Sequence, residues 1–115
     1  MSIEPISTGN APHYQWGEAC DGWHLVRTES LSIIEELMPP GTAERRHKHQ
    51  RARQFFYVLM GQLTIEIEGE EHVLLIHDGI EVPPGHSHQV FNRGKNSASF
   101  LVTSQPPSHG DRIDA

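Results

Sequence analysis

The chain has 115 residues, of which 36% are hydrophobic and 21% charged, and these values are ordinary for one globular domain with its own core. The net charge of −6 argues against a nucleic-acid partner, which usually requires a basic surface. We expect no membrane partner and no signal peptide, because the chain lacks a long apolar run. Cys20 is the only cysteine, so no intramolecular disulfide can form, and we expect a cytoplasmic protein.

All the elements that we expect are β-strands. Residues 1–22 are rich in Gly, Pro, Ser and Asn, which predicts an N-terminal arm with little regular structure. From residue 23 to 104, short strand-like runs alternate with turn signals every eight to twelve residues, as is typical of an all-β sandwich or barrel. Residues 105–115 predict an extended C-terminal tail. The expected strands lie at residues 23–28, 31–38, 54–60, 62–68, 71–76, 79–82, 88–92 and 97–103.

The clearest of these strands spans residues 62–68. Apolar side chains alternate there with polar ones, and this period of two predicts a strand with one buried face. The Gly69-Glu70 pair that follows predicts a tight turn into the next strand. The two strands are therefore expected to form a hairpin.

Three of the nine histidines, His47, His49 and His88, suggest a metal site. His47 and His49 are two positions apart, so an extended backbone directs both imidazoles to the same side. His88 lies far along the chain, but neighbouring strands of a barrel can bring it close, and the amide oxygen of Gln54 can complete the ligand set. Spacing alone leaves metal binding and surface decoration equally open, because His-x-His pairs also occur by chance.

Two segments resemble the two motifs of the cupin superfamily. The first motif consists of Gly, five residues, His-x-His, three or four residues, Glu, six residues and Gly. Residues 41–61 follow it, except that Gln54 stands at the glutamate position. The second motif consists of Gly, five residues, Pro-x-Gly, two residues, His, three residues and Asn. Residues 77–92 follow it, except that His77 replaces the opening glycine. Because two independent patterns occur in the right order, the chain resembles small single-domain cupins over residues 41–92.

The resemblance implies a fold, a metal site and an oligomeric state. The fold is a jelly-roll barrel, or double-stranded β-helix, which we expect over residues 23–104. The site is one divalent transition-metal ion inside one mouth of the barrel, with the ligands His47, His49, His88 and Gln54. Three imidazoles suit Fe, Mn, Co, Ni, Cu or Zn, and the ligand set does not choose among them. Many cupins are dimers, so we also expect a homodimer.

Gln54 separates this chain from the carboxylate-bearing majority of cupins. An amide in place of a carboxylate gives a neutral ligand set, so the ion keeps its full charge and favours an anionic partner in its open positions. Gln54 can instead lie behind the ligands and orient them, and this alternative stays open. His77 is expected to lie in a turn and not to bind the metal.

Few residues near the motifs are candidates for catalysis. His86, two positions before His88, and Tyr57, on the strand after the histidine pair, are the catalytic candidates, with Glu81 as a third titratable group. Four arginines between residues 45 and 53 either form a positive rim that attracts an anionic substrate or stay solvated. Residues 104–112 resemble the ending of some small cupins and are expected to cap the barrel. Within this ending, Asp111 and Arg112 are expected to form an ion pair or to stay solvated.

Two functions fit these features. The first is a metal-dependent enzyme, of isomerase, lyase or dioxygenase type, that acts on a small oxygen-rich, anionic metabolite chelated by the metal. Its ligand set resembles that of sugar-acid cupins that open unsaturated uronates, although their catalytic aspartate has no equivalent in residues 100–103. The second function is a non-catalytic module that binds a sugar or an anion through the metal. A general acid or base beside the metal distinguishes the two, because a binding module needs none.

Overall fold

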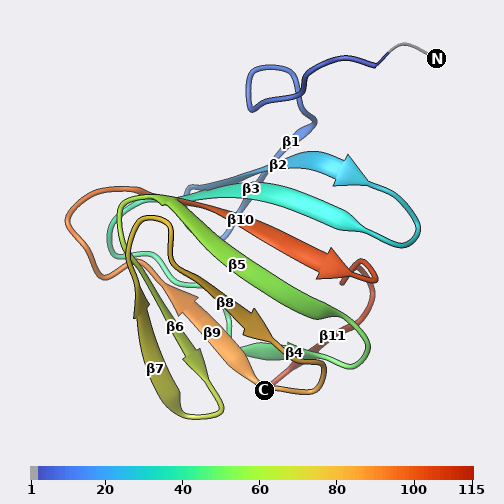
Figure 1. Ribbon diagram of the computed structural model, residues 1–115. Helices are drawn as coiled ribbons and strands as arrows, with labels where there is room; N and C mark the ends of the chain where they lie inside the picture. Colours follow the sequence, from blue (N-terminus) through green and yellow to red (C-terminus); the bar gives the residue numbers. More distant parts are fainter. Residues whose placement is uncertain (1–2) are drawn as a thin grey trace.

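The computed structural model describes residues 3–115, and this part of the chain forms two antiparallel β-sheets that lie in two layers (Figure 1). The expected all-β jelly-roll fold is confirmed. The first sheet contains, in spatial order, β1 (His13–Trp16), β2 (Cys20–Arg27), β3 (Ser32–Met38), β10 (Ala98–Gln105), β5 (Arg53–Met60) and β8 (Gly79–Val82). The second sheet contains β11 (Arg112–Asp114), β4 (His47–His49), β9 (His88–Phe91), β6 (Leu63–Ile67) and β7 (Glu70–Leu74). Among the described residues, no helix is long and apolar enough to cross a membrane.

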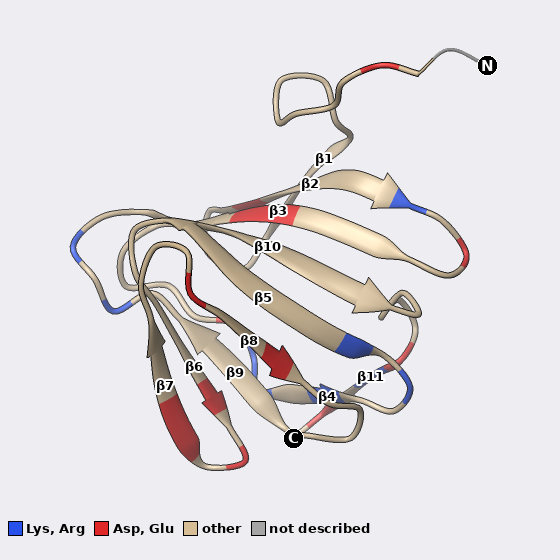
Figure 2. Cartoon of the chain, viewed as in Figure 1, with Lys and Arg blue, Asp and Glu red and all other residues tan. Residues whose placement is uncertain are grey.

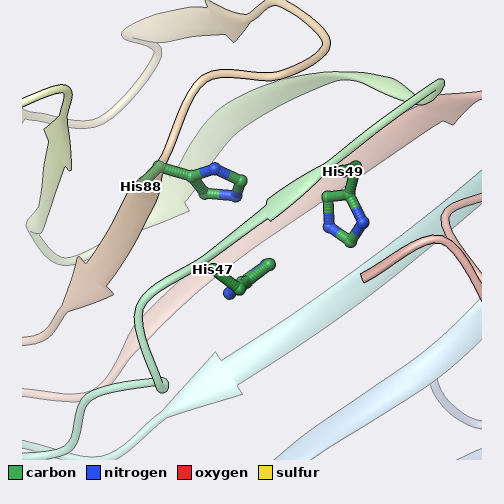
Figure 3. A group of neighbouring side chains, drawn as sticks. All are labelled: His47, His49 and His88. Atoms are coloured by element: carbon green, nitrogen blue, oxygen red, sulfur yellow. The ribbon is translucent and has the colours of Figure 1, made fainter. Parts of the chain in front are cut away.

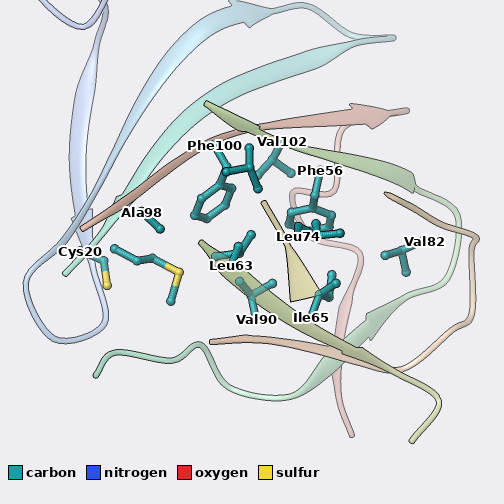
Figure 4. Close-up of a cluster of buried hydrophobic side chains, with 12 residues drawn as sticks. Cys20, Phe56, Leu63, Ile65, Leu74, Val82, Val90, Ala98, Phe100 and Val102 are labelled. Atoms are coloured by element: carbon teal, nitrogen blue, oxygen red, sulfur yellow. The ribbon is translucent and has the colours of Figure 1, made fainter. Parts of the chain in front are cut away.

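The hydrophobic core lies between the two sheets (Figure 4). On β5, Phe56 and Val58 point inward and are buried. Phe55, which alternates with them, points to the outer face and is 43% exposed. Leu63 and Ile65 on β6 meet them from the other sheet and are fully buried. Burying one such side chain contributes about 1.5–3 kcal/mol. The alternation that predicted the strands therefore also fixes which side chains fill the barrel.

The expected hairpin is confirmed, and its turn lies one residue earlier than predicted. β6 and β7 are adjacent antiparallel strands, joined by Glu68 and Gly69. Both residues have positive φ values, 51° and 89°, as a type I′ turn requires. This turn sets the register that directs Leu63 and Ile65 into the core.

The structure contains three strands that the sequence did not place, β1, β4 and β11. β1 lies within the expected irregular arm, and β2 begins at Cys20, before the expected start at Trp23. β11 lies within the expected tail. β1 and β11 are short and largely exposed, so neither shows the apolar alternation that predicts a strand. The division of the chain at residues 22 and 104 stays a prediction, and residues 1–2 of the expected arm lie outside the described residues.

Gly61, the last residue of the first motif, connects β5 to β6 in a conformation that only glycine adopts easily. Its φ is 76°, and a Cβ there would lie 2.5 Å from the carbonyl oxygen of Ser97. We expect Gly61→Ala to lower the free energy of unfolding by about 2–4 kcal/mol in urea denaturation. Gly69→Ala is the matched control, because its φ is 89° but no atom lies within 4 Å of its Cβ, and about 1–2 kcal/mol is expected. Equal losses in the two variants would contradict the role of the Ser97 contact.

Candidate metal centre

Three buried histidines meet inside the barrel at the five-stranded sheet (Figure 3). His47 and His49 come from β4, and His88 comes from the neighbouring strand β9, where it pairs directly with His47. The potential ligand atoms of the three side chains all lie within 4.8 Å of one another. The structure therefore brings together the three histidines that the sequence singled out, and positions them to hold a metal ion.

Two of the imidazoles are oriented by hydrogen bonds to the backbone. Nδ1 of His47 lies 2.7 Å from the carbonyl oxygen of Arg45, and Nδ1 of His88 lies 3.0 Å from that of His86. An Nδ1–H that donates to a carbonyl leaves Nε2 deprotonated and free to bind a metal. Nε2 of His88 is buried and has no hydrogen-bond partner among the described residues. The rings are thus held in the orientation that a metal site requires.

Gln54 faces the same space from the other sheet. It lies at the start of β5 and is 6% exposed, and it lines the cavity with His47 and His49. Its Nε2 donates a hydrogen bond to Ser104 Oγ at 3.0 Å, whereas its Oε1 is buried and has no partner in residues 3–115. The amide therefore presents an unsatisfied acceptor. The residues of this site fit a metal ion, because three neutral imidazoles offer ligand atoms within 4.8 Å of one another and the buried His88 Nε2 has no other partner among the described residues.

Burial keeps the histidines neutral. It lowers the pKa of His47 and of His49 to about 4, with further lowering by His88, and it lowers the pKa of His88 as well. Neutral imidazole is the form that binds metals, so no proton has to be removed at neutral pH.

A cavity of about 270 Å³ opens beside the triad. Two hollows of about 380 and 420 Å³ contain none of the three histidines, although Gln54 also lines the first, so the smaller cavity is the candidate site. Besides two of the histidines and Gln54, the titratable or charged residues that line it are Tyr14, Glu36, Glu44, His109 and Arg112. None of these five was a candidate from the sequence.

Glu36 enters this cavity from β3, within the acidic stretch of that strand that Figure 2 shows. Its Oε2 accepts a hydrogen bond from the Tyr14 hydroxyl at 3.0 Å. Burial raises the pKa of Glu36 to about 7, although the Tyr14 hydrogen bond opposes the rise. A signal for Glu36 was present in the sequence, because a period of two places it on the same face of β3 as Ile34 and Met38.

Glu44 enters the cavity from the segment that leads into β4. Its Oε1 is buried without a hydrogen-bond partner among the described residues. Burial, followed by repulsion from Glu36, raises the pKa of Glu44 to about 8, and Arg112 opposes this rise. No periodic pattern marks this irregular segment, so Glu44 could not be singled out from the sequence.

The C-terminal tail forms part of the site. β11 pairs with β4, so Arg112 lies opposite His49 and lines the cavity. The Asp111 carboxylate accepts three hydrogen bonds of 2.9–3.0 Å from the backbone N–H groups of residues 50–52. The expectation that Asp111 stays solvated or pairs with Arg112 is therefore wrong, because its carboxylate is buried and binds backbone N–H groups, with no Arg112 pair among the described residues. It is 7% exposed and holds the loop between His49 and Gln54.

The catalytic candidates from the sequence lie outside this cavity. His86 is exposed on the loop before β9. Tyr57 lies on the outer face of β5, where its hydroxyl is 3.3 Å from Nδ1 of His77. Glu81 is exposed and lies 3.9 Å from Arg53. The structure does not bring these three to the metal centre. Tyr57 and Glu81 alternate with inward-facing positions of β5 and β8, and His86 lies on a loop outside any strand.

A two-sheet β-barrel with a histidine triad inside it defines a protein of the cupin type. The sequence pattern of the cupin domain matches residues 34–104, which is more than half of the chain. The chain belongs to the cupin family, as its two motifs indicated.

Known proteins with similar sequences and structures come from several organisms. The uncharacterized protein MJ1618 of Methanocaldococcus jannaschii is 31% identical over 89 residues, which cover 76% of this chain and 71% of the relative. An oxalate-binding protein of Thermotoga maritima is 28% identical over 84 residues, which cover 69% of each protein. The solved structure of KdgF from a Halomonas species has a TM-score of 0.84 at 18% identity, and covers 94% of this chain and 97% of KdgF. At that identity, the likeness to KdgF shows the shared fold alone.

Proposed function

We propose that this protein is a metal-dependent cupin enzyme that acts on a small, oxygen-rich anion. The ion's ligands are His47, His49, His88 and Gln54. The observation that carries the proposal is the pair of buried, unpartnered ligand atoms, His88 Nε2 and Gln54 Oε1. A buried polar atom without a partner costs about 1–3 kcal/mol, and a bound ion removes that cost. The donor set of imidazoles and one amide oxygen suits Fe, Mn, Co, Ni, Cu or Zn.

The charge of the site favours an anionic ligand. All four proposed ligands are neutral, so the ion keeps its full charge and, when bound, acts as a Lewis acid on a ligand oxygen. Arg112 adds a positive charge at the same cavity, and none of the four arginines between residues 45 and 53 lines it. A guanidinium binds a carboxylate through charge-assisted hydrogen bonds, so Arg112 orients the anion.

Two carboxyl groups in the cavity favour an enzyme over a binding module. Proton transfer needs an acid or base within reach of the ligand, and Glu36 and Glu44 both line the cavity beside His47 and His49. Isomerase or lyase chemistry uses such proton transfers. The alternative is a non-catalytic binding module, and the similarity to a protein named for oxalate binding supports it.

Arg112→Gln tests the anion-binding part of the proposal. We expect the Kd for oxalate, measured by calorimetry on Co²⁺-loaded protein, to rise about 10–100-fold, because a hydrogen bond to a charged group contributes about 1.5–3 kcal/mol. Arg45→Gln is the control, because the Arg45 side chain is 75% exposed and pairs with Asp114 at the surface. Oxalate that binds equally well without metal, or to Arg112→Gln as to the wild type, would contradict the proposal.

The proposal includes a cytoplasmic homodimer. Val73, Leu75 and Ile76 are 55%, 56% and 51% exposed on or just after β7, which is an edge strand of its sheet. An exposed apolar edge of this kind supports pairing with a second copy. Analytical ultracentrifugation is expected to give a mass of twice 13.0 kDa, and a monomer at all concentrations would exclude the dimer.

A further inference from the structure

We propose that Glu36 and Glu44 are the proton-transfer pair of this cavity, and that Tyr14 is the residue that positions Glu36. The inference rests on the proposed function, because it assigns both carboxyls to the ligand at the metal centre. The substrate class that fits is a small hydroxy or oxo acid with a carboxylate near Arg112 and a C–H bond next to a carbonyl group.

Tyr14 reaches Glu36 across an intervening strand. In the register of the six-stranded sheet, Tyr14 on β1 pairs with Gly22 on β2, and Gly22 pairs with Glu36 on β3. A Cβ at Gly22 would lie 2.2 Å from Cζ of Tyr14, so the phenol ring occupies the space where a side chain at this position would stand. The hydroxyl then donates to Oε2 of Glu36 at 3.0 Å. The glycine thus permits the hydrogen bond that positions the Glu36 carboxyl.

Glu36 and Glu44 come from separate parts of the fold and line one cavity. Glu36 lies on β3, whereas Glu44 precedes β4, the strand that carries His47 and His49. Neither carboxylate belongs to the group of ligand atoms that lie within 4.8 Å of one another. The two carboxyls therefore line the space that a metal-bound ligand would fill, without being ligands of the ion.

A purely structural role does not account for these two acids. Among residues 3–115, neither forms an ion pair, and Glu44 Oε1 has no hydrogen-bond partner. Burying a carboxyl that no salt bridge neutralises costs stability, whereas a proton-transfer group needs the raised pKa that such burial produces. The pKa values of about 7 and about 8 suit that task near neutral pH. The titratable or charged groups that share this cavity with the pair are Tyr14, His47, His49, His109 and Arg112.

The step assigned to the pair is a proton transfer within one substrate molecule. The Glu36 carboxylate, whose charged form the Tyr14 hydrogen bond favours, takes the proton from the carbon next to the carbonyl group, so that the C–H bond breaks and an O–H bond forms on Glu36. The electron pair of the C–H bond moves toward the carbonyl oxygen and gives an enolate. The Glu44 carboxylic acid gives its proton to another atom of the enolate, and the proton on Glu36 then passes to Glu44, so that the substrate leaves as an isomer with no oxidant or reductant. Glu36→Gln is expected to slow exchange of the substrate proton with solvent by about 100-fold or more.

Titration of the glutamate carboxyls by ¹³C NMR on the full metal-free chain tests the pair without any substrate. We expect two carboxyl signals whose titration midpoints lie far above the ordinary glutamate pKa of about 4.3. One of these signals is expected to be missing in Glu36→Gln and the other in Glu44→Gln. Glu35→Gln is the control, because Glu35 lies on the opposite face of β3 and accepts a hydrogen bond from Ser99. Tyr14→Phe removes the hydroxyl that favours the charged form, so it raises the Glu36 midpoint, and Gly22→Ala does the same by displacing the ring. Two ordinary midpoints in the wild type, or a Glu36 midpoint that Tyr14→Phe leaves unchanged, overturn the assignment.

Oxalate binding to Co²⁺-loaded protein supplies the second readout. An anion that enters beside Glu44 raises its pKa, so calorimetry in two buffers at pH 8.5 is expected to show uptake of about one proton per oxalate. Glu44→Gln is expected to bind oxalate with no uptake, and Glu35→Gln to behave as the wild type. If the wild type binds oxalate without taking up a proton, the assignment of Glu36 and Glu44 as the proton-transfer pair is overturned. A failure of oxalate to bind at all overturns the proposed function, while the NMR titration still decides on the two carboxyls.

Discussion

Replacing both His47 and His49 by alanine is expected to abolish stoichiometric metal binding. The double variant leaves His88 and Gln54 as the remaining proposed ligands, and two ligands compete poorly with water for a divalent ion. We expect the metal affinity to fall by more than about 100-fold, since the loss of a group that only orients a ligand already costs about 10–100-fold. Elemental analysis by plasma mass spectrometry measures metal per chain.

His86→Ala is the matched control for this double variant. His86 belongs to the same motif as His88, but it is exposed on the loop before β9, so its loss is expected to leave the metal content unchanged. Circular dichroism checks that each variant keeps its β-structure. A double variant with the metal content of the wild type would contradict the assignment of the site to β4.

Asp111→Ala is expected to destabilise the fold by about 2–4 kcal/mol and to weaken metal binding as well. The carboxylate accepts three backbone N–H groups, including that of the buried Ala52, and alanine leaves these donors without partners. The loop that Asp111 holds connects His49 to Gln54, so the two ligands lose their relative position. Urea denaturation measures the change. Asp114→Ala, on the same strand with a 62% exposed side chain, is the control, and less than about 1 kcal/mol is expected.

The contribution of Asp111 also depends on pH. Burial raises its pKa, but the hydrogen bonds from residues 50–52 outweigh burial, so the pKa lies below the ordinary value of 3.8. A carboxyl whose pKa is depressed in the folded state stabilises the fold above its unfolded-state pKa and loses that effect as the pH falls through the folded value. The stability difference between the wild type and Asp111→Asn is therefore expected to be larger at pH 7 than at pH 3. A difference that grows on acidification would contradict this account.

The parts of the site that the sequence predicted are those that local patterns determine. His47 and His49 share a face because they are two positions apart on one strand, and the motif spacing joined His88 to them. Alternation likewise predicted the buried face of β6 and its hairpin with β7. In each case the signal lies within a few residues or within a known motif.

The rest of the site depends on contacts between distant segments. Tyr14 bonds a carboxyl 22 positions away across a strand, and Asp111 bonds a loop about 60 positions earlier. β1 and β11, which carry Tyr14 and Arg112, are too short and too exposed to show a periodic pattern. The position of Tyr57 is instead a local matter, because the alternation along β5 places it on the opposite face from Gln54, on the outside of the strand. A motif shows which residues meet, but not which distant side chains complete the cavity.

Gln54 makes the proposed ligand set electrically neutral. Its amide nitrogen donates to Ser104, so its oxygen is left without a partner among the described residues, and a glutamate there would bring a negative charge to the same place. In the proposed function, the neutral ligand set leaves the charge of the ion available to an anion, Arg112 adds a second positive charge, and the two carboxyls are assigned to the proton transfers.

The most direct test of the metal site is an anomalous-diffraction map of crystals of the Co²⁺-loaded protein. We predict one peak per chain, about 2.0–2.2 Å from a ring nitrogen of His47, His49 and His88 and from Oε1 of Gln54. A peak at the carboxyls of Glu36 and Glu44, or no peak in the cavity, would contradict the account.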